Sequence, residues 1–446
     1  MTTTIAGTAE AARDATPPTD QTVLRFITAG SVDDGKSTLI GRLLYDSRAI
    51  FADQLAALSR AKHKRAHLDH AGESIDLALL TDGLEAEREQ GITIDVAYRY
   101  FATPRRKFII ADTPGHEQYT RNMVTGASTA DAAVILIDAT RVANGELLAQ
   151  TKRHTMLAAL LGIRHLIVAI NKMDLVEFSE DRFEQIRTAY LQFTKQLANR
   201  NIHFIPLCAL NGDNVVRRSA AMPWYQGPAL LALLEDLPAA AGERAIGLRF
   251  PVQYVLRTDG HKADDFRGYA GRVEAGMVKR GDPVLVLPAG AGARIAAIRS
   301  GDRDVDEAVA GDSVTLLLDR DLDVSRGDTI VAPGSGARIT KDITADLCWL
   351  DNEPFAAQRK YLLRQTTRTV PARVAAIESQ LDIRTLQNMP AGSSLCMNDI
   401  ARARFCLGQP IVCDLFDEHA ITGAFVLIDS ATNQTAAAGM IRAVRP

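Results

Sequence analysis

The spacing of hydrophobic and polar residues changes near the middle of the chain. In the first half, short apolar runs typical of buried strands alternate with longer segments of helical periodicity. In the second half, short strand-like runs are separated by turns rich in Gly and Asp. The pattern therefore predicts a multi-domain fold, α/β plus all-β, in which a doubly wound domain precedes two β-barrels.

The first half contains predicted strands joined by predicted helices. The predicted strands cover residues 24–29, 96–102, 107–111, 133–138, 165–170 and 203–207. The turn 103–106 makes two of these strands a β-hairpin. The predicted helices include residues 117–126, 147–161 and 180–199. In a doubly wound sheet the ligand-binding loops lie at the carboxyl ends of the strands, so these ends are where we expect chemistry.

The second half divides into two groups of predicted strands, after a linker at 239–247. The first group covers residues 250–256, 266–274, 283–287, 293–299, 313–318 and 329–332. The second group covers residues 343–350, 361–377, 394–407, 411–414, 424–428 and 436–444. The predicted regions are a disordered arm at 1–22, an α/β domain at 23–240, and β-barrels at 245–335 and 340–446.

Composition narrows the picture only slightly. The 446 residues carry a net charge of −3 and are 47% hydrophobic, which is ordinary for a globular protein and gives no global sign of nucleic-acid binding. The five cysteines contain no C-x-x-C pair, which favours reduced thiols over a disulfide framework or a metal cluster. There is no apolar run of membrane-spanning length and no signal-peptide pattern. We expect a cytoplasmic protein without nucleic-acid or membrane partners.

The first predicted strand runs into a glycine-containing loop that precedes a helix-forming segment. This loop fits the pattern G-x-x-x-x-G-K-[ST], the P-loop. In a P-loop, backbone N–H groups and the helix N-terminus face phosphates, the lysine approaches the β- and γ-phosphates, and the Ser hydroxyl can bind Mg²⁺. A chance match in a glycine-containing loop is the alternative, but the strand before it and the helix after it favour phosphate binding. The predicted phosphate-binding residues are Gly30, Ser31, Val32, Asp33, Asp34, Gly35, Lys36 and Ser37.

The third predicted strand ends in a D-x-x-G sequence. A carboxylate at the carboxyl end of a strand is well placed for Mg²⁺, and Gly115 lets a backbone N–H approach a γ-phosphate. Asp and Gly are also common turn residues, so this motif alone is a weak signal. Its place at a strand end, after a P-loop, makes it a strong one. The residues predicted to lie at the phosphates here are Asp112, Thr113, Pro114, Gly115 and His116.

The sequence Asn171, Lys172, Met173, Asp174 follows the strand 165–170 and selects a base. The Asp174 carboxylate can accept hydrogen bonds from N1–H and the 2-amino group of guanine, whereas adenine has neither donor. Each hydrogen bond to a charged acceptor is worth about 1.5–3 kcal/mol, so GTP is favoured over ATP. A helix N-cap after a strand is the alternative, which the order of the three motifs disfavours.

These motifs resemble those of the translational, elongation-factor-type GTPases. Within that superfamily the chain is similar to the CysN family, the GTPase subunits of heterodimeric bacterial ATP sulfurylases (sulfate adenylyltransferase subunit 1). The similarity is strongest in residues 30–38, 87–101 and 111–123, with a further match at 265–271. Elongation factors usually have His where Asp34 stands and Thr where Ser37 stands.

The resemblance implies roles that the motifs alone do not assign. Thr93 would bind Mg²⁺ through its hydroxyl, together with Ser37 and Asp112, and help to hold the attacking water. His116 would orient that water, although a helix-capping histidine is the alternative. The catalytic residues expected on this basis are Lys36, Thr93 and His116.

The resemblance implies two further contacts. Val32 and Ile92 would form an apolar gate beside the predicted catalytic histidine. Cys208, Ala209 and Leu210 stand where Ser-Ala-Leu is usual, and a backbone N–H there would contact guanine O6. Because the contact is made by the backbone, cysteine in place of serine should preserve it.

The resemblance also implies a reaction and a partner. With Mg²⁺ and a small catalytic subunit (CysD), such a GTPase would couple GTP hydrolysis to formation of adenosine 5′-phosphosulfate and pyrophosphate from ATP and sulfate. The chain shows no S-G-G-x-D-S loop and no second P-loop, so we expect adenylyl transfer on the partner and no fused adenylylsulfate kinase. The alternative is a translation elongation-type GTPase that carries aminoacyl-tRNA.

Overall fold

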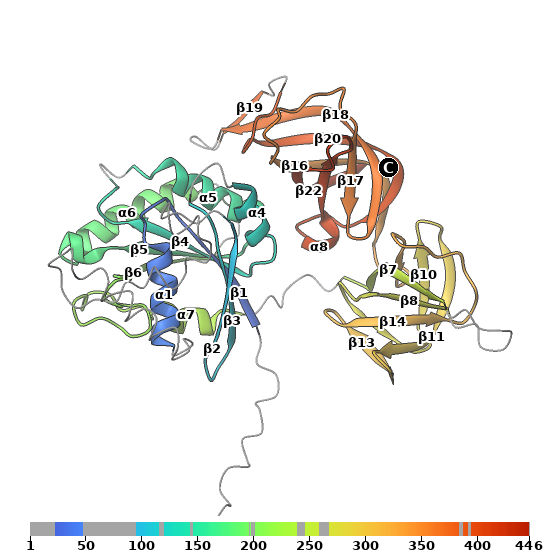
Figure 1. Ribbon diagram of the computed structural model, residues 1–446, viewed down its shortest axis with the longest axis horizontal. Helices are drawn as coiled ribbons and strands as arrows, with labels where there is room; N and C mark the ends of the chain where they lie inside the picture. The colour runs from blue at the N-terminus through green and yellow to red at the C-terminus, as the bar shows by residue number, and fades with distance from the viewer. Residues whose placement is uncertain are drawn as a thin grey trace, which may run out of the picture.

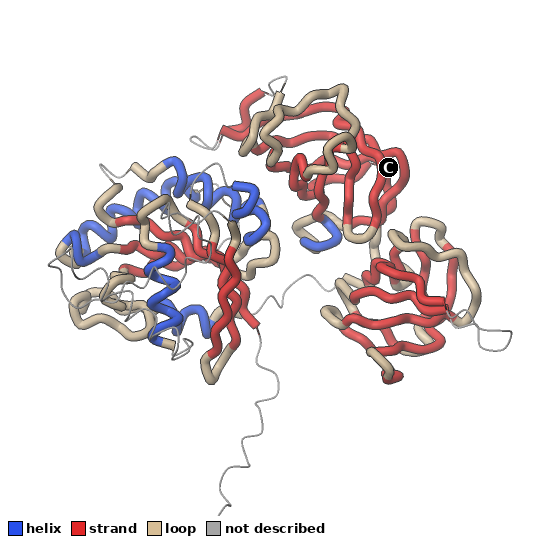
Figure 2. The backbone as a smooth tube through the Cα atoms, in the orientation of Figure 1, coloured by secondary structure: helices blue, strands red, loops and turns tan. Residues whose placement is uncertain are grey.

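Three groups of helices and strands follow one another along the chain (Figures 1 and 2). The computed structural model describes residues 23–47, 95–115, 120–142, 146–195, 197, 201–238, 246–257, 267–382, 387–390 and 394–445. The first group mixes helices and strands, and the other two are almost entirely strands. This is the α/β-then-all-β fold that the hydrophobic pattern predicts. The residue boundaries of the domains stay predictions, and the expected arm at 1–22 lies outside the described residues.

The first group is a six-stranded sheet with helices on both faces. Its strands are β1 (Val23–Ala29), β2 (Ala97–Ala102), β3 (Lys107–Asp112), β4 (Ala132–Asp138), β5 (His165–Asn171) and β6 (Asn201–Pro206). They lie in the order β2-β3-β1-β4-β5-β6, with β2 antiparallel to β3 and the other neighbours parallel. Its helices are α1 (Lys36–Asp46), α4 (Thr120–Ala127), α5 (Ala149–Leu160), α6 (Glu180–Thr194), α7 (Leu230–Asp236) and the 3-10 helix η4 (Met173–Val176).

Burial explains the different patterns of the strands in this sheet. Every residue of the central strand β4 is buried, because helices cover both faces of the sheet. The edge strand β2 instead alternates, with Tyr98 and Tyr100 exposed. Helices α1 and α7 pack on one face with Leu39 and Leu234, whereas α4 and α5 pack on the other. Because β1, β3, β4 and β5 are parallel, their carboxyl ends meet at one edge of the sheet.

The second group closes into a six-stranded barrel. Its strands are β7 (Arg249–Arg257), β8 (Arg267–Arg272), β9 (Met277–Lys279), β10 (Pro283–Leu287), β11 (Ala291–Ser300), β12 (Arg303–Val305), β13 (Glu307–Val309), β14 (Ser313–Leu318) and β15 (Thr329–Val331). The order β10-β15-β7-β8-β14-β11 returns to its start through the β10–β11 pairing. Inward-facing Phe250, Tyr269 and Ile330 belong to its core.

The third group is a second closed barrel. It contains β16 (Arg338–Trp349), β17 (Tyr361–Gln365), β18 (Arg368–Asp382), β19 (Gln387–Pro390), β20 (Ile400–Cys413), the short helix α8 (Ala420–Gly423), β21 (Ala424–Asp429) and β22 (Thr435–Arg445). The order β17-β21-β22-β16-β20-β18 closes through the β17–β18 pairing. Trp349, Phe405 and Phe425 lie in its core.

Several strand boundaries differ from those expected. The predicted strand 361–377 is a hairpin, β17 and β18, that turns at Thr366 with a φ of 47°. Threonine is a strand-former and gives no turn signal, so the sequence reads as continuous. Conversely, one strand replaces two predicted strands, 394–407 and 411–414. This is β20, which runs through Pro410 and overlaps parts of both. The short strands β9, β12 and β13 have no counterpart among the predicted strands.

The third group contacts both of the other groups, the helices α4 and α5 of the first group and the barrel of the second. Cys348, Leu350 and Ile400 belong to the same hydrophobic cluster as α4 and α5, and Arg121 of α4 donates a hydrogen bond to the carbonyl of Leu350 at 2.8 Å. Between the barrels, Arg249 forms a buried ion pair with Asp414 of the third group at 2.8 Å. Within the described part of the chain, no helix has both the length and the apolar composition needed to cross a membrane.

Candidate nucleotide-binding site

The loop between β1 and α1 has a backbone that only glycine can complete. Gly35 adopts a φ of 93°, in the left-handed region. A Cβ at this position would lie 2.3 Å from Nδ2 of Asn171, which is closer than any real contact. Asn171 instead donates a hydrogen bond to the backbone carbonyl of Asp34 at 2.8 Å. The end of β5 therefore fixes the start of α1.

Lys36 lies inside the loop that it follows. Its side chain is 7% exposed, and its Nζ donates hydrogen bonds to the carbonyls of Gly30 and Ser31 at 2.9 Å each. Burial lowers the pKa of Lys36, while the carboxylates of Asp112, Asp34 and Asp33 raise it. A buried ammonium group at the N-terminus of a helix is suited to bind an anion, because the cation and the backbone N–H groups both attract negative charge.

The end of β3 reaches the same loop. Asp112 is 2% exposed, and the hydroxyl of Thr28 on β1 donates to its Oδ1 at 3.3 Å. Thr113 donates to the carbonyl of Thr28 at 2.6 Å. A Cβ on Gly115 would lie 2.5 Å from Nζ of Lys36. The structure thus brings the D-x-x-G sequence against the P-loop lysine.

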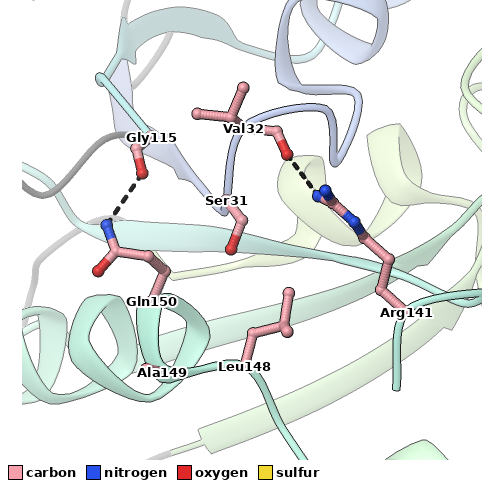
Figure 3. Close-up of a pocket in the computed structure, with 7 residues that line it drawn as sticks. All are labelled: Ser31, Val32, Gly115, Arg141, Leu148, Ala149 and Gln150. Atoms are coloured by element: carbon pink, nitrogen blue, oxygen red, sulfur yellow. Dashed lines mark hydrogen bonds between the residues drawn. The ribbon is translucent and has the colours of Figure 1, made fainter. Parts of the chain in front are cut away.

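A cavity of about 390 Å³ opens beside these residues (Figure 3). It is lined by Ser31, Val32, Gly115, Arg141, Leu148, Ala149 and Gln150. Gln150 of α5 donates a hydrogen bond to the carbonyl of Gly115 at 3.0 Å. The cavity therefore lies between the P-loop, the D-x-x-G segment and the start of α5.

Asn171 connects this phosphate side to the segment after β6. Its Oδ1 accepts a hydrogen bond from the backbone N–H of Ala209 at 2.9 Å, while its amide nitrogen binds the P-loop. Arg42 of α1 adds a second link, because its guanidinium donates to the carbonyls of Ala209 and Leu210. One neutral amide and one guanidinium therefore hold the predicted base loop against the predicted phosphate loop.

The predicted base-binding side chains lie near one another. Cys208 is buried, and burial raises its pKa to about 12, with a hydrogen bond to Asp174 as the second cause. That bond places the thiol beside the carboxylate that we expect to select guanine. Lys172 pairs with Asp138 at 2.8 Å. Burial raises the pKa of Asp138, but hydrogen bonds from Lys172 and Thr140 bring it below its usual value.

Most of the predicted site residues fall within the described part of the chain. Ser31, Asp34, Thr113 and Met173 are buried, whereas Asp33 and Leu210 are exposed, and Val32 and Ser37 are intermediate. Pro114 is buried between Thr113 and Gly115. The predicted catalytic residues Thr93 and His116, and the gate residue Ile92, lie outside the described residues. Their roles stay predictions, as do those of the other site residues.

The oxygen donors near the loop suit Mg²⁺. The buried Asp112 carboxylate and the Ser37 hydroxyl at the start of α1 are hard oxygen ligands, and Mg²⁺ is usually held by one or two such groups together with substrate phosphates. Among the described residues, no group of three or more His, Cys, Asp or Glu side chains is arranged to hold a metal. The two oxygen donors, Asp112 and Ser37, are of the kind that holds Mg²⁺ together with nucleotide phosphates.

Several residues of this site carry no signal in the sequence. Thr28 and Gln150 touch the D-x-x-G segment, and Arg42 holds the base loop, from positions outside every motif. Arg141 reaches the P-loop from the turn after β4. The pattern of strand ends places that turn near the phosphates, but it does not single out the arginine.

Two family models match the chain. The model described as the elongation factor Tu GTP binding domain matches residues 21–240, and one described as GTP-eEF1A C-terminal domain-like matches residues 342–442. A solved structure of sup35 complexed with GDP aligns over 98% of both chains, at 24% identity and a TM-score of 0.43.

Closer similarity is found among curated proteins. A sulfate adenylyltransferase subunit 1 from Laribacter hongkongensis is 50% identical over 425 residues, which cover 95% of this chain and 86% of that protein. One from Teredinibacter turnerae is 50% identical over 94% of this chain and 87% of its own length. A bifunctional enzyme CysN/CysC from Mycobacterium tuberculosis is 49% identical over 94% of this chain and 67% of its own length.

Proposed function

The chain belongs to the sulfate adenylyltransferase subunit 1 family, and from that premise we propose that it hydrolyses GTP and couples the hydrolysis to sulfate activation. In the coupled reaction, ATP and sulfate give adenosine 5′-phosphosulfate and pyrophosphate. The observation that carries the proposal is the convergence of three motifs at one sheet edge. Asn171 touches the P-loop and the base loop at once, and Gly115 touches Lys36.

The chain's own residues account for binding. The Lys36 ammonium and the N-terminus of α1 attract the β- and γ-phosphates. The Asp174 carboxylate accepts two hydrogen bonds from guanine, and Asn171 holds the base loop in place while it does so. Bound Mg²⁺ would supply charge to offset the anionic phosphates, with Ser37, Asp112 and Thr93 as the residues that hold it.

Hydrolysis needs a positioned water molecule. We assign that task to His116, which directly follows the segment that contacts Lys36. Loss of the γ-phosphate would release the segments that it holds, and this converts the chemistry into a change of shape. Formation of a sulfate–phosphate anhydride is unfavourable, so coupling to GTP hydrolysis gives it a driving force.

The partner is a second subunit. The name subunit 1 in relatives of half-identical sequence supports a heterodimer, and we propose that a small catalytic subunit (CysD) binds ATP and sulfate in the complex. The chain contains one P-loop and no S-G-G-x-D-S loop, which agrees with adenylyl transfer on that partner. GTP and ATP are cytoplasmic nucleotides, so we place the complex in the cytoplasm.

The translation-factor alternative shares the fold. The family models named for elongation factors fit both readings, because they describe domains and not a whole function. The relatives that match most of the chain at 50% identity favour sulfate activation. The two readings predict different activators, which makes them separable by experiment.

The test is GTP hydrolysis by the protein co-purified with its small subunit. We expect ATP together with sulfate to stimulate the hydrolysis, and ribosomes with charged tRNA to leave it unchanged. The reverse result would establish the translation-factor alternative. In the same assay His116→Ala should retain GTP binding and lose hydrolysis, and a variant that still hydrolyses GTP would remove His116 from the mechanism.

A further inference from the structure

Asp34 places a carboxylate within the phosphate-binding loop. Its carboxylate is completely buried beneath the loop, and its Oδ2 accepts a hydrogen bond from the backbone N–H of Ser31 at 2.6 Å. Its Oδ1 is also buried and has no hydrogen-bond partner among the described residues. Burial raises the pKa of Asp34, whereas Lys36, the Ser31 amide and Arg141 lower it. A buried anion in this position repels a ligand whose own charges are negative.

Arg141 supplies the opposite charge from outside the loop. Its Nη1 lies 3.7 Å from the Oδ1 of Asp34 and donates a hydrogen bond to the carbonyl of Val32 at 2.6 Å (Figure 3). The arginine comes from the turn after β4, so it ties a second strand end to the P-loop. Its side chain is 43% exposed and lines the cavity beside Gly115.

The other charged groups near Asp34 have partners of their own. Lys36 is held by two loop carbonyls, and Asp138 is paired with Lys172 at 2.8 Å. If the Lys36 ammonium turned to the phosphates of a bound triphosphate, it would neutralise Asp34 less. Arg141 would then be the cation best placed to balance the buried carboxylate.

We propose that Asp34 and Arg141 form a charge-compensating brace under the P-loop, in which Arg141 cancels the repulsion between the Asp34 carboxylate and the phosphates of GTP. The inference rests on the proposed GTP-binding function and deepens it. Asp34 shapes the loop through the Ser31 amide, and Arg141 makes that carboxylate compatible with an anionic ligand. Arg141 is a positioning residue in this account. Because GTP carries more negative charge than GDP, the brace should matter more for GTP.

The experiment separates charge from packing by rescue. Dissociation constants for GTP and GDP are measured by calorimetry for Arg141→Ala, Arg141→Gln, Asp34→Asn and the double variant Asp34→Asn with Arg141→Ala. Asparagine keeps an acceptor for the Ser31 amide but removes the charge. We expect either Arg141 variant to weaken GTP binding by about tenfold and GDP binding by less, given that the ion pair is partly exposed. Asp34→Asn alone should bind GTP at least as tightly as wild type, and the double variant should return to wild-type affinity.

Arg187→Ala is the matched control. Arg187 lies on α6 in the same domain, is 45% exposed and pairs with Glu184, so it has the exposure of Arg141 without its location. Its removal should leave GTP affinity unchanged. Thermal unfolding of each variant checks that the fold is retained. Because both arginines are partly exposed, we expect their replacement to leave the fold intact.

The outcomes divide cleanly. Wild-type GTP affinity in both Arg141 variants overturns the brace while leaving the proposed function intact. A double variant as weak as Arg141→Ala also overturns it, because the arginine would then act independently of the Asp34 charge. A wild-type protein that does not bind GTP overturns the brace and the proposed function together.

Discussion

The two halves of the nucleotide site are built from different interactions. Around the phosphate loop the structure buries charged side chains. Lys36 and Asp34 are buried, and Asp112 is 2% exposed. Around the base loop it uses mainly hydrogen bonds, with the amide of Asn171 between the P-loop and Ala209. The phosphate half therefore depends on balanced charge, and the base half depends on geometry.

This difference follows from the two parts of the ligand. Phosphates offer strong, non-directional charge, which a buried cation and a helix N-terminus attract at close range. Guanine offers a fixed pattern of donors and acceptors, which only correctly placed groups can read. If the comparison is right, variants of the phosphate half should lose affinity whatever the base, whereas variants of the base half should lose selectivity among bases. Each prediction below concerns one of the two halves.

The largest effect should come from the lysine of the phosphate half. Lys36→Ala removes the cation that the loop encloses, and we expect GTP affinity to fall by about a thousandfold, as for other buried charge contacts. Inosine triphosphate, which has the same phosphates, should lose as much. Lys279→Ala, on the exposed edge of the first barrel, is the control. Calorimetric titration measures both, and a loss confined to one nucleotide would contradict the division.

The base half should respond in the opposite manner. Asp174→Ala removes the acceptor for N1–H and the 2-amino group, so GTP affinity should fall by about a hundredfold. Wild-type protein should prefer GTP to inosine triphosphate, which lacks the 2-amino group, and the variant should bind the two nearly equally. Competition binding with a fluorescent GTP analogue measures this ratio. A preference that survives in Asp174→Ala would show that another group reads the base.

A pH effect on stability should originate in the phosphate half. His154 of α5 is buried, and burial, followed by the charges of Lys36 and Arg153, lowers its pKa from 6.5 to about 3. The unfolded chain takes up a proton below pH 6.5 and the folded protein does not, so stability is lost as pH falls from 6.5 towards 3. The loss from this group should reach about 1.4 kcal/mol per pH unit. His154→Gln should flatten that slope in urea unfolding, and an unchanged slope would contradict the assignment.

The smallest effect should come from the thiol of the base half. Cys208→Ser keeps the backbone N–H of Ala209 and a donor to Asp174, so GTP affinity should change by less than about threefold. Burial raises the pKa of Cys208 to about 12, so it stays protonated at neutral pH. Iodoacetamide should therefore label the exposed Cys396 before Cys208, as mass spectrometry can show. Early labelling of Cys208 would mean that the base loop opens.

The sequence predicts the parts of this site that lie in motifs of fixed spacing or in segments of regular hydrophobic period. The apolar runs predict the sheet, and the P-loop and D-x-x-G residues meet as expected because parallel strands end at one edge. Local periodicity does not encode contacts between distant segments. Arg42 contacts Ala209, which is 167 residues away along the chain, and Arg141 contacts Val32, which is 109 residues away. The turn at Thr366 shows the same limit, since its threonines look like strand.

The strand-rich half of the chain illustrates why closure is harder to foresee than the strands themselves. In each barrel some pairings join strands that are neighbours in sequence, such as β10–β11 and β17–β18, whereas the first strand of each group pairs with the last, β7 with β15 and β16 with β22. The alternating pattern predicts the strands, but the register that joins first to last depends on packing in the cores around Phe250 and Phe405. The attachment of the third group to α4, through Arg121 and Leu350, has no sequence signal.

The central claim is that this sheet edge binds a guanosine triphosphate. The measurement that tests it most directly is a calorimetric titration of the purified protein with GTP and Mg²⁺, repeated in the presence of a large excess of ATP. The account predicts one GTP per chain, with an affinity that ATP leaves nearly unchanged because adenine offers Asp174 neither an N1–H nor a 2-amino group. Displacement of GTP by ATP at comparable concentration, or the absence of GTP binding, would contradict it.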